Sequence, residues 1–186
     1  HDIPPETFPV IMMVCRSDTR KEKALNAFFS AAEIFGKLHR YGVFVHIGAG
    51  NTKQLEEQYR ERAHTVNRRV GRHVLISTAF GSHQPAKYLH LATLVVGMGR
   101  SAFESMALSK PTLVLSNDGF GGIVNEQQIN NLSYTNFTAR HFSADHFCKQ
   151  QPAQALVKAI ESLLDNAILA SDTGRFGRKY YEDKLS

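Results

Sequence analysis

Two glycines and a serine, in the segment Gly97-Met98-Gly99-Arg100-Ser101, lie between an apolar run and an amphipathic one. Paired glycines allow a tight turn that brings the backbone close to a ligand. A helix starting at such a turn offers free amide groups and the positive end of its dipole, which favour a phosphate. Glycine turns are also common without a ligand, and Ser101 with Glu104 has the spacing of a helix-capping box. This segment alone leaves a phosphate site and an ordinary helix start both open.

Two basic residues, Arg16 and Lys21, follow the apolar run that ends at Cys15. A cation gains nothing from the dipole near the start of a helix. Their placement therefore slightly favours a role on an anionic ligand over that of solvated charges.

Composition excludes several classes of function. The chain has 186 residues, 42% of them hydrophobic, which suits one domain with a real core. Its net charge of +5 fits an anionic partner, but no zinc-ligand spacing, RNA-binding aromatic motif or helix-turn-helix signature supports nucleic acid. The nine histidines show no metal-ligand spacing, so we expect no metal site. Two cysteines and the lack of a signal-peptide pattern favour a reducing, cytoplasmic setting.

Short apolar runs alternate with amphipathic segments along the chain. We expect strands at residues 8–15, 43–47, 74–77, 94–96 and 112–115. We expect helices at residues 20–39, 85–90, 101–108, 154–170 and 174–183, and one whose cap is Asn51 with Gln54. Leu25, Phe28, Phe35 and Leu38 would share the buried face of the first helix. This alternation predicts an α/β, Rossmann-like, mainly parallel sheet with helices on both faces.

The residues with chemical potential follow the ends of these strands. In an open parallel sheet the ligand lies beyond the carboxyl ends of the strands. We therefore expect one cleft to be lined by Arg16, Gly48, the segment from Gly97 to Ser101, Glu104 and a glycine-rich loop from Asn117 to Gly122.

Three segments together resemble a known enzyme family. Gly97-Met-Gly-Arg-Ser-Ala-Phe-Glu-Ser-Met-Ala-Leu-Ser-Lys-Pro-Thr-Leu-Val-Leu resembles the motif G-x-G-R-S-x-x-E-A-M-A-x-G-x-P-V-I-V of retaining, nucleotide-sugar-dependent glycosyltransferases of the GT-B fold. Upstream, Arg16-Ser-Asp-Thr-Arg-Lys resembles R-L-D-x-x-K, and His46-Ile-Gly-Ala-Gly resembles x-I-x-G-x-G. Their order and rough spacing also agree with this group, glycosyltransferase family 4 or glycosyl transferases group 1.

The resemblance implies that residues 1–186 form the C-terminal, donor-binding half of a GT-B enzyme. Arg16 and Lys21 would bind the donor pyrophosphate and stabilise it as the leaving group, which makes them the catalytic pair. Glu104 would accept both ribose hydroxyls. The remaining donor-binding residues would be Gly48, Phe80 beside the base, Gly97, Gly99, Arg100, Ser101 and Gly121.

One position departs from the family pattern. Many members carry a glutamate that touches the donor sugar, eight positions before the ribose glutamate, where this chain has Val96. Sugar recognition must therefore differ, and the loop with Asp118 is a candidate, although an Asp-Gly pair is more often only a turn.

The expected function is transfer of a sugar from a nucleoside diphosphate sugar to a glycan or a lipid-linked glycan. The resemblance implies no metal and no cofactor, and an N-terminal domain, not supplied by this chain, that binds the acceptor. We expect a cytoplasmic protein, compatible with peripheral association at the inner face of the membrane, and an isolated chain that transfers no sugar. Two alternatives are a stand-alone nucleotide-binding regulatory module and a nucleotide-sugar epimerase relative. The epimerase pattern of paired acids is absent, because Ser105 follows Glu104.

Overall fold

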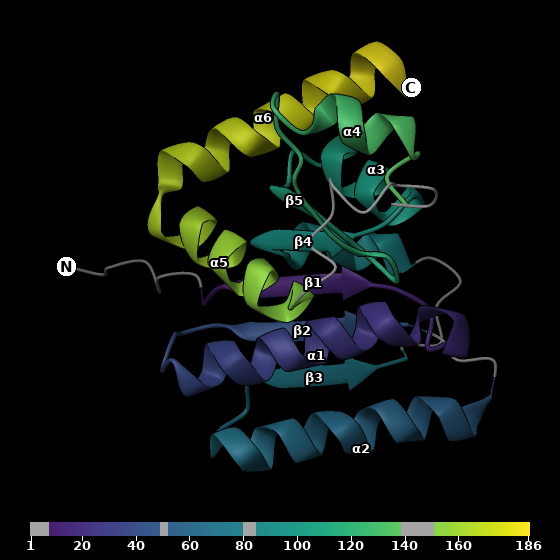
Figure 1. Ribbon diagram of the computed structural model, residues 1–186, viewed down its shortest axis with the longest axis vertical. Coiled ribbons are helices and arrows are strands. Elements are labelled where there is room, and N and C mark those ends of the chain that lie inside the picture. The colour runs from purple at the N-terminus through teal and green to yellow at the C-terminus, as the bar shows by residue number, and fades with distance from the viewer. Residues whose placement is uncertain (1–7, 49–51, 80–84, 139–150) are drawn as a thin grey trace.

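The strands form one mixed sheet. The computed structural model describes residues 8–48, 52–79, 85–138 and 151–186. Its strands lie in the order β3-β2-β1-β4-β5-β6 (Figure 1), all parallel to their neighbours except β6, which runs antiparallel to β5. Their bounds are β1 Val10–Val14, β2 Val43–Ile47, β3 Leu75–Thr78, β4 Leu94–Gly97, β5 Thr112–Ser116 and β6 Gly119–Ile123. The expected α/β, Rossmann-like, mainly parallel sheet is confirmed.

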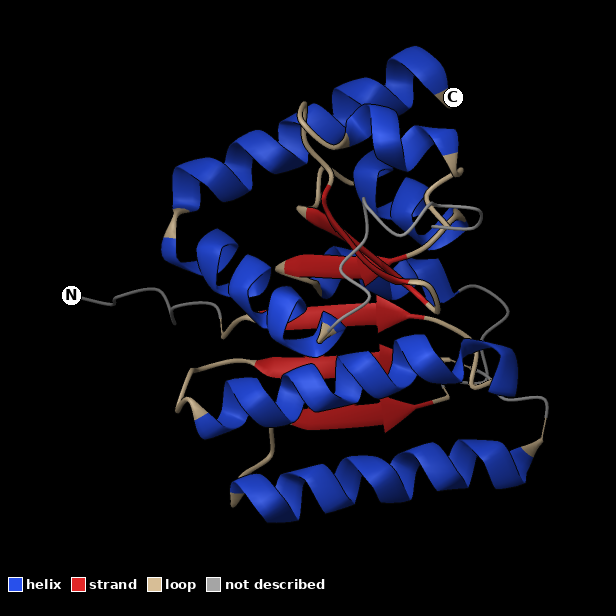
Figure 2. Cartoon of the chain, viewed as in Figure 1, coloured by secondary structure: helices blue, strands red, loops and turns tan. Residues whose placement is uncertain are grey.

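Helices cover both faces of this sheet (Figure 2), as the apolar strands require. One face packs against α1 (Glu22–Lys37), α2 (Lys53–Val70) and α5 (Pro152–Asp165). The other packs against a 3-10 segment (Pro85–Leu91), α3 (Arg100–Ala107) and α4 (Ile129–Tyr134). The last helix, α6 (Ala167–Lys184), starts beside the first of these cores and ends on the core around α3. Because β4 and β5 are buried along their whole length, their side chains can be apolar throughout.

The helix boundaries correct several expectations. On α1, Leu25, Phe28 and Phe35 are fully buried, but Leu38 lies just beyond the last helical residue and is 53% exposed. The cap of α2 is Thr52, whose side chain accepts a hydrogen bond from the Leu55 amide; Asn51 lies outside the described residues.

The division between the last two helices also differs from the expected one. It falls at Asn166, which caps α6 through the Leu169 amide, and not at residues 171–173. Gly174 therefore lies inside α6. An ideal Cβ on Gly174 would stand 2.2 Å from the carbonyl oxygen of Ser109, so this glycine serves close packing rather than a helix start.

Two elements escaped the sequence pattern. The segment expected to be a glycine-rich loop contains the edge strand β6, whose residues 119–123 pair with β5 through an irregular register. The short helix α4 follows it. No helix in the described ranges is long and apolar enough to cross a membrane.

A buried histidine ties three strands together near their carboxyl ends. The His46 side chain is fully buried on β2, with Nε2 2.7 Å from the Cys15 carbonyl oxygen and Nδ1 2.9 Å from Ser77 Oγ. Since a carbonyl can only accept, Nε2 carries the proton and Nδ1 accepts from the Ser77 hydroxyl. Burial lowers the pKa of His46 to about 4, so the ring stays neutral at physiological pH.

This shift predicts a pH-dependent stability. In the unfolded chain the pKa of His46 returns to 6.5, so between pH 6.5 and about 4 the unfolded state binds more protons than the folded state. Stability is therefore lost as pH falls through this range. Between pH 7 and pH 5 the free energy of unfolding of the wild type should drop by about 2 kcal/mol more than that of His46→Gln.

Urea unfolding at the two pH values measures this difference, with His64→Gln on the exposed side of α2 as the control. Equal pH dependence in wild type and His46→Gln would show that His46 does not carry the effect.

Candidate functional site

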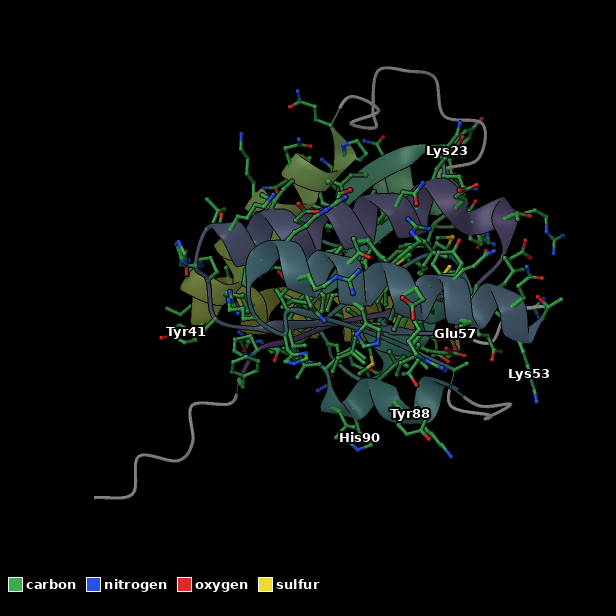
Figure 3. The ribbon with its side chains drawn as sticks, turned by 90° about the horizontal axis from the view of Figure 1, so that it is seen from below. Lys23, Tyr41, Lys53, Glu57, Tyr88 and His90 are labelled. Carbon is green, nitrogen blue, oxygen red and sulfur yellow. The ribbon has the colours of Figure 1, made fainter. Side chains whose placement is uncertain are left out.

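The topology predicts a ligand crevice between β1 and β4. These two strands are parallel neighbours, yet β1 leads to α1 on one face of the sheet while β4 leads to α3 on the other. Ligands of open α/β sheets bind at such a switch point, beyond the carboxyl ends of the strands. Figure 3 shows the start of α1 (Lys23) and the start of α2 (Lys53) at one end of the molecule, opposite Tyr41 before β2.

The β1–α1 connection presents cations to this crevice. Its Asp18 carboxylate, only 5% exposed, accepts from the amide of Arg20 at 2.8 Å and from the Arg20 guanidinium at 2.8 Å. The hydrogen bond from Asp18 raises the pKa of Arg20. Arg20 is thus committed to Asp18, whereas neither Arg16 nor Lys21 forms an ion pair within the described ranges.

A direct contact joins the two sides of the crevice. The Lys21 ammonium donates to the Met98 thioether sulfur at 3.4 Å, 77 residues away in the chain. Thioether sulfur is a weak acceptor, so this contact leaves the ammonium able to bind a stronger one. Lys21 therefore stands beside the β4–α3 turn, where the sequence predicts phosphate-binding amides.

The β4–α3 turn differs from the capping box allowed by its spacing. Gly99 holds the cap position of α3 with φ 53° and ψ −122°, a conformation suited to glycine. The Ser101 hydroxyl accepts from the Met98 amide and donates to the Met98 carbonyl, rather than pairing with Glu104. The Gly99 carbonyl accepts from the amides of residues 102 and 103. The amides of Arg100 and Ser101 have no acceptor in the described part of the chain.

Glu104 is half-buried on α3. Burial raises the pKa of its carboxyl group, and the charge of Arg100 opposes that rise. Its carboxylate has no hydrogen-bond or ion-pair partner among the residues that the structure describes. Since the capping role is ruled out, its two oxygens are available to a ligand.

Two of the predicted glycines are required by close packing. An ideal Cβ on Gly48 would stand 2.0 Å from the carbonyl oxygen of Cys15, and one on Gly97 would stand 3.0 Å from the Ala102 amide nitrogen. Both glycines let neighbouring strand ends and the α3 start approach one another.

The segment after β5 holds a residue whose role the sequence did not indicate. Asn117 accepts from the Ala24 amide at 3.0 Å and donates to the Arg20 carbonyl, which links it to the start of α1. Gly121 lies on the edge strand β6, where the register with β5 is irregular, and not in a loop. Phe80, expected beside the base, lies outside the described residues.

A groove of about 640 Å³ lies between α1 and α5, at the end of β5. Of the residues expected to share one cleft, only Asn117, Asp118 and Gly119 line it. Its polar rim also includes Lys23, Asn26 and Ser30 from α1 and Gln154 from α5. The structure thus joins Lys21 to Met98 and Asn117 to the α1 start, while Glu104 and Gly121 make no hydrogen bond or ion pair with these residues in the described part of the chain.

No group of three histidine, cysteine, aspartate or glutamate side chains in the described ranges could hold a metal ion. What the described residues offer instead is the Lys21 ammonium beside the β4–α3 turn, where two amides have no acceptor among them; this combination suits a phosphate-bearing ligand.

Solved structures show what this arrangement is similar to. No protein-family model and no curated protein matches the sequence. TarM of S. aureus is 17% identical, with a TM-score of 0.66 over 100% of this chain and 35% of that chain. The C-terminal domain of the glycosyl transferase group 1 family protein LpcC from Francisella tularensis is 14% identical, with a TM-score of 0.65 over 96% and 88%. WaaG, a glycosyltransferase involved in lipopolysaccharide biosynthesis, is 14% identical, with a TM-score of 0.60 over 97% and 44%.

At these identities the likeness establishes the fold alone. The chain has the Rossmann-like fold of the C-terminal domain of GT-B glycosyltransferases, and it spans about a third of the length of TarM.

The close approach at Gly48 predicts that any side chain at this position lowers the stability of the fold. Gly48→Ala forces Cβ against a backbone carbonyl, so it should lower the free energy of unfolding by at least about 2 kcal/mol. Gly71→Ala is the matched control: φ is +80° but nothing lies within 4 Å, so only backbone strain of about 1 kcal/mol is expected. Urea denaturation compares the two, and an equal or smaller loss at Gly48 would contradict the proposed contact.

Proposed function

We propose that this chain is the donor-binding domain of a glycosyltransferase that uses a nucleoside diphosphate sugar. The observation that supports it most directly is the Lys21–Met98 contact, which places an unpaired cation beside the α3 start. Two amides without acceptors and a glycine cap complete an anion site at that turn. Structures of TarM and GtfA, which share this fold, contain UDP.

The proposed chemistry needs a charge-stabilised leaving group. As the bond between the sugar's anomeric carbon and the diphosphate oxygen breaks, negative charge grows on the diphosphate. Arg16 and Lys21 would stabilise that charge more strongly in the transition state than in the bound donor, which lowers the barrier. Glu104 would accept hydrogen bonds from the two ribose hydroxyls and set the register of the nucleotide.

Sugar recognition would take a different form from that of the resembling family. Val96 is fully buried on β4, so its side chain is not available to a ligand. The polar groove beside the crevice offers Asp118, Asn26 and Ser30 instead. We propose this groove edge as the place where the donor sugar is distinguished.

The acceptor side would come from another domain. We propose that residues 1–186 are one half of a two-domain enzyme whose other half binds a glycan or lipid-linked glycan. A lipid-linked acceptor would bring such an enzyme to the cytoplasmic face of a membrane. Without the second half, closure over the donor is lost and the isolated chain should bind nucleotide without transferring sugar.

A nucleotide-binding regulatory module is the second candidate, because fold alone does not decide function. It would share the phosphate site but not need a sugar subsite. Tighter binding of a nucleoside diphosphate sugar than of the bare diphosphate favours the transferase.

Nucleotide binding tests the proposed anion site. UDP, GDP or ADP should bind, and at a hundred times its dissociation constant the bound nucleotide should stabilise the domain by about 2.7 kcal/mol. Affinity should fall as salt rises, because Arg16 is exposed and Lys21 is only half-buried, so salt screens both charges. Lys21→Met and Arg16→Met should each weaken binding roughly ten- to hundredfold and flatten the salt dependence. Thermal shift followed by calorimetric titration provides the measurement, and salt-independent binding would contradict the assignment.

The ribose role proposed for Glu104 can be tested separately. Glutamine keeps the shape but has only one acceptor oxygen and no charge. Because Glu104 caps nothing, Glu104→Gln should leave the melting temperature nearly unchanged while weakening nucleoside diphosphate binding by about 1.5–3 kcal/mol, or roughly ten- to hundredfold. The exposed Glu126→Gln, which removes the same charge, is the control. Inorganic pyrophosphate has no ribose, so Glu104→Gln should not weaken its binding; an equal loss for both ligands would point to a general electrostatic effect instead.

A further inference from the structure

A 3-10 turn (Thr19–Lys21), capped by the Asp18 side chain, runs directly into the start of α1. Lys21 occupies the cap position, and its side chain makes no capping hydrogen bond. The first amides of a helix need acceptors from outside it. Here the acceptor for the Ala24 amide is the Asn117 side-chain oxygen, 93 residues away at the end of β5.

The same side chain also holds the other end of this segment. Asn117 Nδ2 donates to the Arg20 carbonyl oxygen, so one carboxamide bonds both sides of Lys21. Only a carboxamide offers an acceptor and two donors on one planar group of this size. Aspartate could accept from Ala24 but would face the Arg20 carbonyl with a second acceptor.

These bonds bear on the anion site because of what lies between them. Lys21 reaches across to Met98 from the stretch of backbone that Asn117 holds. The other bonds shown for this segment are local: Asp18 accepts from Arg20, the Lys21 amide donates to the Asp18 carbonyl, and the Glu22 amide donates to the Thr19 carbonyl. The end of β5 therefore determines where a cation between β1 and β4 lies.

We propose that Asn117 is a positioning residue for the anion site: it holds the Arg20–Ala24 backbone so that the Lys21 ammonium stands at the β4–α3 turn. The inference rests on the proposed function, since it assigns the cation to a diphosphate. Asn117 itself spends its carboxamide on the backbone and acts on the ligand through Lys21.

A purely structural asparagine is available for comparison. Asn67 on α2 accepts from the amides of Val74 and Leu75, each at 2.9 Å, and donates to the Leu75 carbonyl at 2.8 Å. It joins α2 to β3 and makes no bond to the β1–α1 or β4–α3 segments. Asn67→Ala thus removes an equivalent set of backbone bonds without touching the cation.

The test is a double-mutant cycle read by calorimetric titration with UDP and with inorganic pyrophosphate. Asn117→Ala should weaken both ligands by up to about tenfold, the scale of ordering one flexible side chain. In a Lys21→Met background the same change should weaken them by no more than about twofold, because the cation it positions is gone. Asn67→Ala should lower the melting temperature and leave both affinities unchanged.

The outcomes distinguish failure of the positioning role from failure of the proposed function. Binding by the wild type with equal losses for Asn117→Ala in both backgrounds, or with an unchanged affinity, overturns the positioning role while the proposed function stands. Failure of the wild type to bind either ligand overturns both. If Asn117→Ala does not fold, Asn117→Ser enters the same cycle, and faster hydrogen exchange at the Ala24 amide reports whether the bond has been lost.

Discussion

The adjacency of β1 and β4 is the constraint on which the rest of the site depends. Because these parallel neighbours send their helices to opposite faces, a ligand crevice is expected beyond their carboxyl ends. Lys21 enters it from one side and the glycine cap of α3 from the other, so the contact between Lys21 and Met98 is a consequence of strand order.

Polar side chains without apparent catalytic purpose hold the ends of the strands in place. His46 joins β1, β2 and β3, Asn67 joins α2 to β3, and Asn117 joins β5 to the start of α1. In the described ranges no buried side-chain nitrogen or oxygen lacks a partner. Satisfied buried polar groups favour one arrangement over alternatives, because an unpaired one costs about 1–3 kcal/mol. The position of the β1–α1 connection, which carries Lys21, therefore depends on these buried polar groups.

The fold and the proposed reaction are separate conclusions. Similarity below 20% identity to TarM, LpcC and WaaG establishes the fold alone, while the proposed nucleotide site rests on the charges, the amides without acceptors in the described residues and the half-buried Glu104 of this chain. The chain differs most clearly from the resembling family at Val96, where a buried valine stands at the position of the acid that touches the donor sugar in many members.

The sequence alone determined the α/β class, the order of the parallel strands along the chain and the clustering of Arg16, Lys21 and the Gly97 turn at strand ends, because apolar period and glycine placement are local signals. It could not determine β6, since four residues of the run Gly119–Ile123 are glycine or aromatic and read as a turn until β5 supplies a partner. Nor could it separate a capping box from the Ser101–Met98 bonds, which share one spacing. Only the tertiary structure brought Asn117 to Arg20 and Lys21 to Met98, because contacts across more than 70 residues depend on how strands are ordered in the sheet and leave no trace in local periodicity.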